Sequence, residues 1–502
     1  MNILNFLIQG FSVALQPINL GVALIGAFIG TLAGALPGIG PINGVAVLLP
    51  IAYTLNLPPE TALIMLSGIY YGAEYGGRIS SILLNIPGDS SAVMTTLDGH
   101  PLAKQGRASQ ALAISAISSF IGGTIAVVGL TLFAPLLATL AIKFGPAEYF
   151  ALIVFSFSVL AIIVGHKPIK TAIAAILGMM LTTVGVDSST GILRYTYGQP
   201  ELYDGIDFLI VVIGLFAISE IFILLEKTDT SKLVPIEIKD RAWQWLEIFK
   251  YKWTILRASI IGFTIGVLPG TGASVASAVA YSLEKRIGDR DGTFGKGDVR
   301  GLAAPEAANN AAAGGAFVPM LTLGIPGSGT TTILLGALLL YNIQPGPMLF
   351  SERPEIAGGL IASMYVGNLM LLVLNLPLVK VFTRILLIPL WLLVPGITVM
   401  ATIGVLSVHG SIFSLFWMLG IGLFGYFLRK LDYSLVPFIL GFVLGELLEA
   451  NLRRALAISG GQIDILFQSE ISRVLWFLTI LTIAVLPAFQ SIRKAILQKA
   501  KS

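Results

Sequence analysis

The sequence LPGIG at residues 36–40 interrupts one apolar run, and LPGTG at residues 268–272 interrupts another. Proline removes a backbone N–H and glycine destabilises helices, so neither stretch favours an unbroken helix. Both stretches lie in segments apolar enough for lipid, where every backbone polar group needs a partner inside the protein. The two stretches therefore predict helices that are interrupted within a membrane.

The composition places the chain among membrane proteins. Of its 502 residues, 55% are hydrophobic and 12% are charged, and none is cysteine. The runs 208–225, 356–379 and 474–489 are close to the length that crosses roughly 30 Å of hydrocarbon as a helix. They lack the alternation of barrel strands, so we expect an all-α, polytopic helical membrane protein. Residues 1–59 carry no charge, so we expect no signal peptide.

Lysine and arginine predict which loops face the cytoplasm. They are frequent in residues 227–254 and 284–300, which are therefore expected inside. The intervening segment leaves the cytoplasm and returns to it, because its longer arm, 254–267, spans only about 21 Å as a helix. We predict a re-entrant hairpin with LPGTG at its tip. The same reasoning places loops 88–107 and 166–170 inside and loops 139–147 and 187–205 outside.

The first hairpin is expected to start from the opposite side, because its surroundings are uncharged up to Glu60. An odd number of predicted crossings then separates the two hairpins, which makes them inverted. We expect a first inverted repeat at 1–226, a cytoplasmic linker at 227–254, and a second repeat with C-terminal helices at 255–502. Residues 1–20 form either a short interfacial helix or the start of a span. In the linker, RAWQWLEIFKYKW (241–253) predicts an interfacial helix and no nucleic-acid binding.

The repeat extends beyond the two tips. Gly38 precedes Glu74 by 36 residues, and Gly270 precedes Glu306 by the same number. A second broken motif follows each glutamate, NIPGDSS at 85–91 and GIPGSGT at 324–330, with seven extra residues before the second copy. Discontinuous helices in inverted repeats are typical of secondary transporters.

An interrupted helix presents free ends to a ligand. Its N-terminal end favours an anion, its C-terminal end favours a cation, and glycine lets the ligand approach the backbone. Hydroxyl and amide side chains flank each break and can complete a polar site. We therefore predict that the substrate is bound by Pro37, Gly38, Gly40, Asn43, Arg78, Asn85, Ser90, Ser91, Gly270, Gly272, Ser274, Gly327, Ser328, Thr330 and Thr331.

Ionisable residues in apolar segments are costly and point to function. Glu74 and Arg78 are four residues apart, so they form either a structural ion pair or a site where Arg78 meets a substrate carboxylate. Glu306 is either an interfacial helix-end carboxylate or functional. We assign ion coupling to Glu74, Glu306, Asn309 and Asn310, with Na⁺ or H⁺ as the coupling ion and no cofactor or metal. Asp89 and Asp98 are expected to cap loops, and Glu220 to be structural.

The longer motifs resemble a known family. GTLAGALPGIGPINGVAVLLP, YYGAEYGGRISSILLNIPGDSS, GVLPGTGASVASAVAYSLEKR and GLAAPEAANNAAAGGAFVPMLTLGIPGSGTTT are similar to the large membrane subunit of the tripartite tricarboxylate transporters, the TctA family. The resemblance implies loops 37–43, 87–91, 269–274 and 326–331 as the site. The part of the chain after residue 350 carries no motif of this kind.

The same resemblance implies a function and partners. Members are symport carriers of the bacterial inner membrane that take up small di- or tricarboxylates such as citrate, driven by an ion gradient. They work with a small four-helix membrane subunit and a periplasmic solute-binding protein, and an elevator-type fold is expected.

Two other functions were weighed against this one. A stand-alone symporter of a neutral or zwitterionic solute is compatible with the hydroxyl-rich breaks. An intramembrane enzyme is disfavoured, because the chain contains no HExxH or GxSxG motif and its three histidines lie in or near predicted loops. We therefore expect a transporter and not an enzyme.

Overall fold

The computed structural model describes residues 3–36, 38–163, 167–187, 189–226, 236, 245–289, 291–375, 377–378, 381–382, 384 and 390–499. Seven of the described helical segments are long and apolar enough to cross a membrane. In the described part of the chain, strands are limited to β1 (Gly185–Val186) and β2 (Leu193–Arg194), an antiparallel pair. The all-α, polytopic class predicted from the sequence is confirmed.

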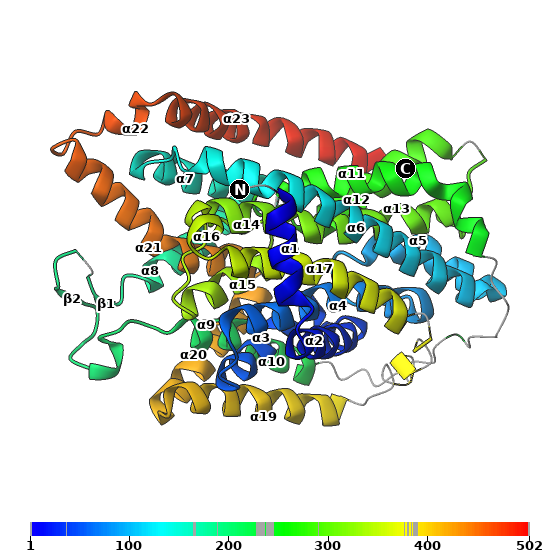
Figure 1. Cartoon of the computed structure of the whole chain (residues 1–502), viewed down its shortest axis with the longest axis horizontal. Helices are drawn as coiled ribbons and strands as arrows, with labels where there is room; N and C mark the ends of the chain where they lie inside the picture. Colours follow the sequence, from blue (N-terminus) through cyan, green and yellow to red (C-terminus); the bar gives the residue numbers. More distant parts are fainter. Residues whose placement is uncertain are drawn as a thin grey trace.

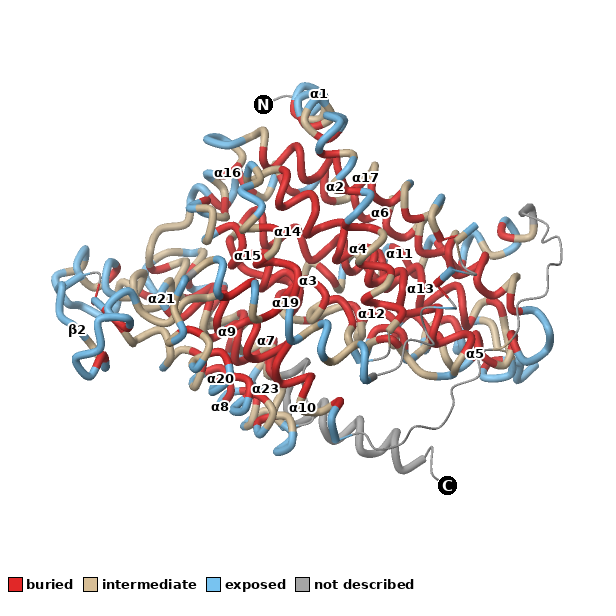
Figure 2. Tube along the Cα trace, turned by 90° about the horizontal axis from the view of Figure 1, so that it is seen from below, coloured by how far each residue is buried: buried red, intermediate tan, exposed pale blue. Residues whose placement is uncertain are grey.

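The helices fall into two groups by their contacts, and the two groups share one hydrophobic core; Figures 1 and 2 show their positions from two sides. The core group contains α1 (Ile3–Ala14), α2 (Pro17–Ala35), α3 (Gly40–Thr54), α4 (Pro59–Leu84), α5 (Val93–Leu102), η1 (Ala103–Arg107), α6 (Ala108–Ala141), η4 (Trp245–Tyr251), α11 (Lys252–Val267), α12 (Gly272–Gly288), α13 (Val299–Gly315), α14 (Phe317–Leu323), α15 (Gly329–Leu340), α16 (Pro347–Glu352) and α17 (Pro354–Asn375).

The flanking group packs beside the core group and is built from two separate parts of the chain. It contains α7 (Pro146–Ile163), α8 (Pro168–Leu181), η2 (Pro200–Leu202), α9 (Phe208–Val212), η3 (Ile213–Ile218), α10 (Ser219–Glu226), α19 (Leu390–His409), α20 (Ile412–Lys430), α21 (Leu435–Ile458), α22 (Ile465–Gln468) and α23 (Glu470–Lys499). Figure 2 shows α8, α20 and α23 on one side of the molecule and α2, α6 and α17 on the other. Each half of the chain therefore contributes to both groups.

The predicted helices are present. The run 208–225 forms the continuous helix α9–η3–α10, residues 356–375 of the run 356–379 lie in α17, and the run 474–489 lies in α23. Residues 3–14 form a helix of their own, α1, separated from α2 by Leu15 and Gln16. Most of the predicted linker, including residues 241–244 of the expected interfacial helix, lies outside the described residues, and residues 245–251 form the 3₁₀-helix η4.

Helices α4 and α13 lie at the centre of the core group (Figure 2). Every residue from Thr61 to Leu83 of α4 and from Gly301 to Gly315 of α13 is buried. A helix that is buried on all sides needs no polar face toward water, so any polar residue that it carries must find a partner inside the protein. Neither helix is among the seven apolar spans.

Glycines bring α2 against α4 and α11 against α13 with almost no space between the backbones. A methyl group on Gly34 would lie 1.9 Å from the carbonyl oxygen of Ala73. The same type of contact, in which a glycine faces a backbone carbonyl, occurs in both halves: Gly30 with Ile69, Gly34 with Ala73, Gly262 with Ala308 and Gly266 with Ala312.

These contacts correct the position of the seven extra residues. Counted along the helices from the glycine contacts, Glu306 occupies the position of Ser67, and Glu74 that of Ala313. The extra residues of the second copy therefore precede α13, in the loop that follows α12. The equal spacing of 36 residues from Gly38 to Glu74 and from Gly270 to Glu306 does not reflect equivalent positions.

The same register aligns the ends of α4 and α14. Asn85 and Gly324 follow these helices with left-handed φ values of 58° and 68°. In each case the next residue donates its N–H back into the helix, Ile86 to the Ser80 carbonyl and Ile325 to the Pro319 carbonyl. Both motifs therefore close their helix with a residue in the left-handed conformation.

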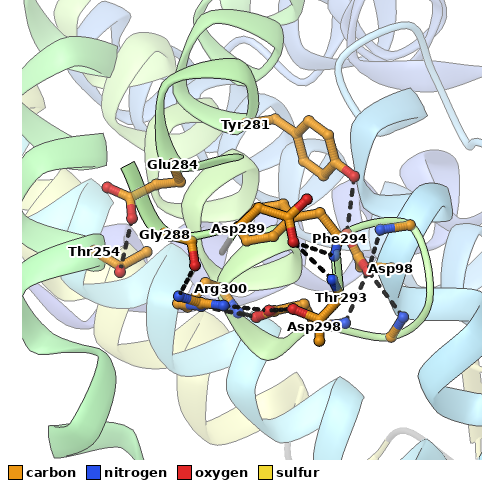
Figure 3. Close-up of polar contacts among 12 residues, drawn as sticks. Asp98, Thr254, Tyr281, Glu284, Gly288, Asp289, Thr293, Phe294, Asp298 and Arg300 are labelled. Atoms are coloured by element: carbon orange, nitrogen blue, oxygen red, sulfur yellow. Dashed lines mark hydrogen bonds and ion pairs between the residues drawn. The ribbon is translucent and has the colours of Figure 1, made fainter. Parts of the chain in front are cut away.

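Asp98 of α5 joins the two halves of the core group (Figure 3). Its Oδ1 accepts the backbone N–H groups of Gly295, Gly297 and Asp298 at 2.8–2.9 Å, and its Oδ2 accepts the Tyr281 hydroxyl at 2.9 Å. Asp98 thus orders the loop between α12 and α13, in agreement with its expected role.

Asp298 begins α13 within the same loop. It caps the helix by accepting the N–H of Arg300, and its carboxylate also accepts hydrogen bonds from the Arg300 side chain and the Thr293 hydroxyl. Burial alone would raise the pKa of Asp298, but the hydrogen bonds from Arg300 and Thr293 hold this pKa below its usual value. Asp298 therefore stays ionised where the dipole of α13 favours a negative charge.

The glycine contact predicts opposite effects for two substitutions in α2. G34A forces α2 away from α4 and should lower the free energy of unfolding by about 1–3 kcal/mol. G21A adds a methyl group that meets nothing within 4 Å, and should be neutral or slightly stabilising because alanine favours the helix. Thermal unfolding of the purified protein in detergent measures both, and equal stabilities would contradict the contact.

The Asp98 contacts predict that D98A destabilises the protein by about 3 kcal/mol, because three backbone N–H groups and the Tyr281 hydroxyl lose their acceptor. D291A in the same loop serves as the control, because Asp291 is exposed and its loss should change stability by less than about 0.5 kcal/mol. Thermal unfolding again gives the comparison. A D98A protein as stable as D291A would show that the loop does not depend on Asp98.

Candidate functional site

Both tips line a single cavity of about 600 Å³. Of the substrate-binding and ion-coupling residues predicted from the sequence, the structure places eleven on its wall: Gly38, Gly40, Asn43, Glu74, Ser90, Ser91, Gly270, Gly272, Ser274, Ser328 and Thr330. Pro37 lies outside the described residues. Two tips that are far apart in sequence thus contribute to one site.

The two tips have closely similar backbone conformations. The first glycines, Gly38 and Gly270, have φ values of 91° and 76°, and the second, Gly40 and Gly272, have φ values of 62° and 65°. Side-chain-bearing residues rarely adopt these values, which explains why glycine occupies both positions in both tips.

Each tip is held by the second broken motif of its own half. Gly38 donates its N–H to the Gly88 carbonyl at 3.2 Å, and Gly272 donates to the Gly327 carbonyl at 3.4 Å. These bonds satisfy backbone groups that the interrupted helices leave free. The tip and the second motif therefore form one unit in each half.

Three helices begin at the cavity. Gly40, Gly272 and Gly329 are the first residues of α3, α12 and α15, and all three line the wall. Ser328 caps α15 through a capping box with Thr331, which fixes the direction of that helix. The positive dipole ends of three helices make the cavity a favourable place for an anion.

Side chains connect the two halves across the cavity. The Ser90 and Ser274 hydroxyls lie 2.7 Å apart, and the Tyr70 hydroxyl lies 3.3 Å from the Ser328 hydroxyl. A solute bound between the tips would therefore contact both halves of the chain.

Two carboxylates on the wall share one hydroxyl. The Ser91 hydroxyl lies 3.1 Å from Glu74 Oε2 and 2.8 and 2.9 Å from the two oxygens of Asp89. Asp89 also accepts the Ala92 N–H, so the expected capping role holds, but it lines the cavity as well. One hydroxyl proton cannot satisfy both carboxylates, which leaves acceptor capacity at this point.

Arg78 does not line the cavity and does not pair with Glu74. Its Nη2 donates to Asn375 Oδ1 at 3.1 Å, and its guanidinium lies 4.8 Å from the centre of the Tyr75 ring. No ion pair joins Arg78 to Glu74 among the described residues, so the structural ion pair, one of the two alternatives for these residues, is wrong. The reason is that α17 supplies an acceptor for Arg78 while Ser91 supplies a donor for Glu74.

The remaining predicted residues lie around the cavity and not on its wall. Asn85 is exposed at the end of α4, while Gly327 and Thr331 are buried next to Ser328. Glu306 accepts the hydroxyls of Thr95 at 2.5 Å and Ser119 at 2.9 Å.

Asn309 and Asn310 are buried in α13 near the same layer. In the described part of the protein, the side-chain oxygens of both asparagines lack a hydrogen-bond partner. They form part of a buried polar layer together with Glu306 and Arg78, which the structure places behind the cavity wall.

Sequence reasoning missed one side of the cavity. The flanking group contributes Phe216, Arg429, Tyr433, Ser434, Leu435 and Val436. These residues follow no repeated motif, and Arg429 and Lys430 read as basic residues at a helix end. The one available signal was Glu220, a carboxylate in an apolar span, which binds Arg429 at 2.5 Å.

The chain is similar to two proteins of Agrobacterium vitis. An uncharacterized 52.8 kDa protein in the TAR-I ttuC' 3' region of Agrobacterium vitis is 42% identical over 497 residues, which are 98% of this chain and 98% of that protein. An uncharacterized protein in the TAR-II ttuC' 3' region of the same organism is 41% identical over 234 residues, covering 46% of this chain and 97% of its own length. No solved structure matches the chain.

The family itself is clear from the sequence match. The tripartite tricarboxylate transporter TctA family model covers residues 20–440, which include both tips, both second motifs and Arg429. This is a family of transporters and not of enzymes. The chain is therefore a multi-pass membrane protein that belongs to the tripartite tricarboxylate transporter TctA family.

Proposed function

We propose that this protein imports a small di- or tricarboxylate across the bacterial inner membrane, coupled to an ion gradient. It would act as the large membrane subunit beside a small four-helix membrane subunit and a periplasmic solute-binding protein. The observation that carries the proposal is the convergence of α3, α12 and α15 by their N-terminal ends on one cavity.

The helix ends suit a carboxylate for an electrostatic reason. Each end carries about half a positive charge, which stabilises a carboxylate nearby. The positive φ values of Gly40 and Gly272 favour glycine at both positions. Because glycine has no side chain, nothing covers the backbone at these two points of the wall. A neutral solute would gain less from the same ends.

The carboxylates of Glu74 and Asp89 supply the coupling site in this proposal. They lie at a point where the Ser91 hydroxyl, which both carboxylates share, satisfies them incompletely. A cation at this point would neutralise them before an anionic substrate could bind beside them. Na⁺ fits the oxygen ligands, and H⁺ fits a carboxylate pair that shares one proton.

The position of the cavity between two helix groups favours an elevator motion. The tips and second motifs belong to the core group, while Arg429, Tyr433 and Ser434 belong to the flanking group. If the core group moves along the flanking group, the tips carry the substrate and the coupling ion across together.

The coupling ion is tested by uptake into proteoliposomes that contain the membrane subunits, with the binding protein added outside. Radiolabelled citrate, malate and succinate are offered under an inward Na⁺ gradient at equal pH, and under a pH gradient at equal Na⁺. We expect one gradient to stimulate uptake of one of these acids at least tenfold. Uptake of none of the acids under either gradient would contradict the proposal.

Two matched substitutions test the coupling residue. E74Q removes the charge beside Asp89 on the cavity wall and should abolish stimulation by the ion gradient. E306Q removes an equally buried carboxylate behind the wall, whose acceptors are used by Thr95 and Ser119, and should keep the stimulation at a lower protein yield. The ratio of uptake with and without the gradient measures both variants. Coupling that is lost in E306Q and kept in E74Q would reverse the assignment.

A further inference from the structure

The cavity contains a positive side chain that comes from outside the repeated motifs. Arg429, in the last turn of α20, lines the wall, and its side chain is 31% exposed. We propose that Arg429, positioned by Glu220, binds one carboxylate of the substrate and so makes the site selective for acids with at least two carboxylates. This inference rests on the proposed function and names the residue that recognises the charge of the substrate.

The contacts of Arg429 leave most of its donors available. Its Nη1 binds Glu220 Oε2 at 2.5 Å, and no other side-chain partner of the guanidinium occurs among the described residues. A guanidinium carries five N–H donors in a fixed plane, and a carboxylate accepts two of them side by side. Glu220 is 3% exposed, so its carboxylate fixes one edge of the guanidinium from within the protein.

Arg78 is not an alternative receptor for the substrate. Its side chain is 1% exposed and is held by Asn375 and the Tyr75 ring. It is absent from the cavity wall, whose charged members are Glu74, Asp89 and Arg429 in the described part of the chain. A substrate carboxylate in the cavity therefore has one arginine within the wall to meet.

The distribution of charge explains the preference for two carboxylates. Glu74 and Asp89 lie on the core side, and Arg429 lies on the flanking side. A carboxylate bound at the helix ends on the core side gains little from Arg429 on the flanking side of the cavity. A second carboxylate on the same molecule is therefore the natural ligand for Arg429. A monocarboxylate would leave either the helix ends or Arg429 without an anion.

Lys430 provides a control for a purely structural role. It neighbours Arg429 in the same helix turn and pairs with Glu226 of α10, as Arg429 pairs with Glu220. Lys430 does not line the cavity. Both basic residues thus tie α20 to α10, and only Arg429 faces the proposed substrate.

The test uses the absence of native cysteine. S434C places a single thiol on the half-buried part of the cavity wall, where bound solute should block alkylation by N-ethylmaleimide. The S434C protein, S434C/R429Q and S434C/K430Q are each titrated with citrate, malate, succinate and acetate in the presence of the coupling ion. The concentration that halves the alkylation rate reports binding directly, without a need for transport.

We expect R429Q to raise this concentration for the best di- or tricarboxylate about tenfold to a hundredfold, which is the range for a lost charge-assisted hydrogen-bond pair. K430Q should change it less than about twofold, and acetate should bind weakly and equally to all three proteins. The double exchange E220Q/R429Q, which leaves no buried unpaired carboxylate, should bind as weakly as R429Q while unfolding at the temperature of the S434C parent.

Three results would overturn the inference. R429Q that binds like K430Q would remove Arg429 from the site while leaving the proposed function intact. An equal loss for acetate and for the larger acids would show that R429Q only distorts the cavity. If none of the four acids protected the S434C parent, the proposed function would fail together with the inference.

Discussion

The structure depends on hydrogen bonds for backbone groups that lie inside a membrane protein and outside any continuous helix. Lipid offers such groups no partner. Each tip therefore binds the second broken motif of its own half, through Gly38 and Gly88 in one case and Gly272 and Gly327 in the other. Left-handed caps at Asn85 and Gly324 close the adjoining helices. The cavity lies where both tips and both second motifs meet.

Much of the site was predictable because short local motifs supply its residues. Proline and glycine in fixed order mark the tips, and eleven predicted residues line the cavity. The equal spacing from Gly38 to Glu74 and from Gly270 to Glu306 suggested a wrong alignment of the two glutamates. The two spacings are equal only by coincidence, because the second copy has extra residues before α13. The opposite wall was missed for a different reason. Arg429 belongs to a helix that no motif marks, and its role depends on tertiary packing that brings α20 to the tips.

The division of charge between the helix groups relates the site to a transport cycle. The core group carries the helix N-termini at the cavity and the carboxylates of Glu74 and Asp89. It therefore holds the groups that would bind the substrate and the coupling ion. The flanking group carries Arg429, held to α10 by Glu220. Relative movement of the two groups would change the distance between these charges. The affinity of the cavity would then differ between the two sides of the membrane, as alternating access requires.

The buried position of α4 and α13 has a consequence for biogenesis. Both helices carry the polar residues of the centre, and neither is apolar enough to stand among the seven membrane-crossing segments. A segment of this kind partitions poorly into lipid when it leaves the translocon alone. It becomes stable once α2 or α11 covers it through the glycine contacts. Membrane integration of this chain should therefore proceed by pairs of helices. The pairs α2–α3 and α11–α12 would be held at the translocon until α4 and α13 are synthesised.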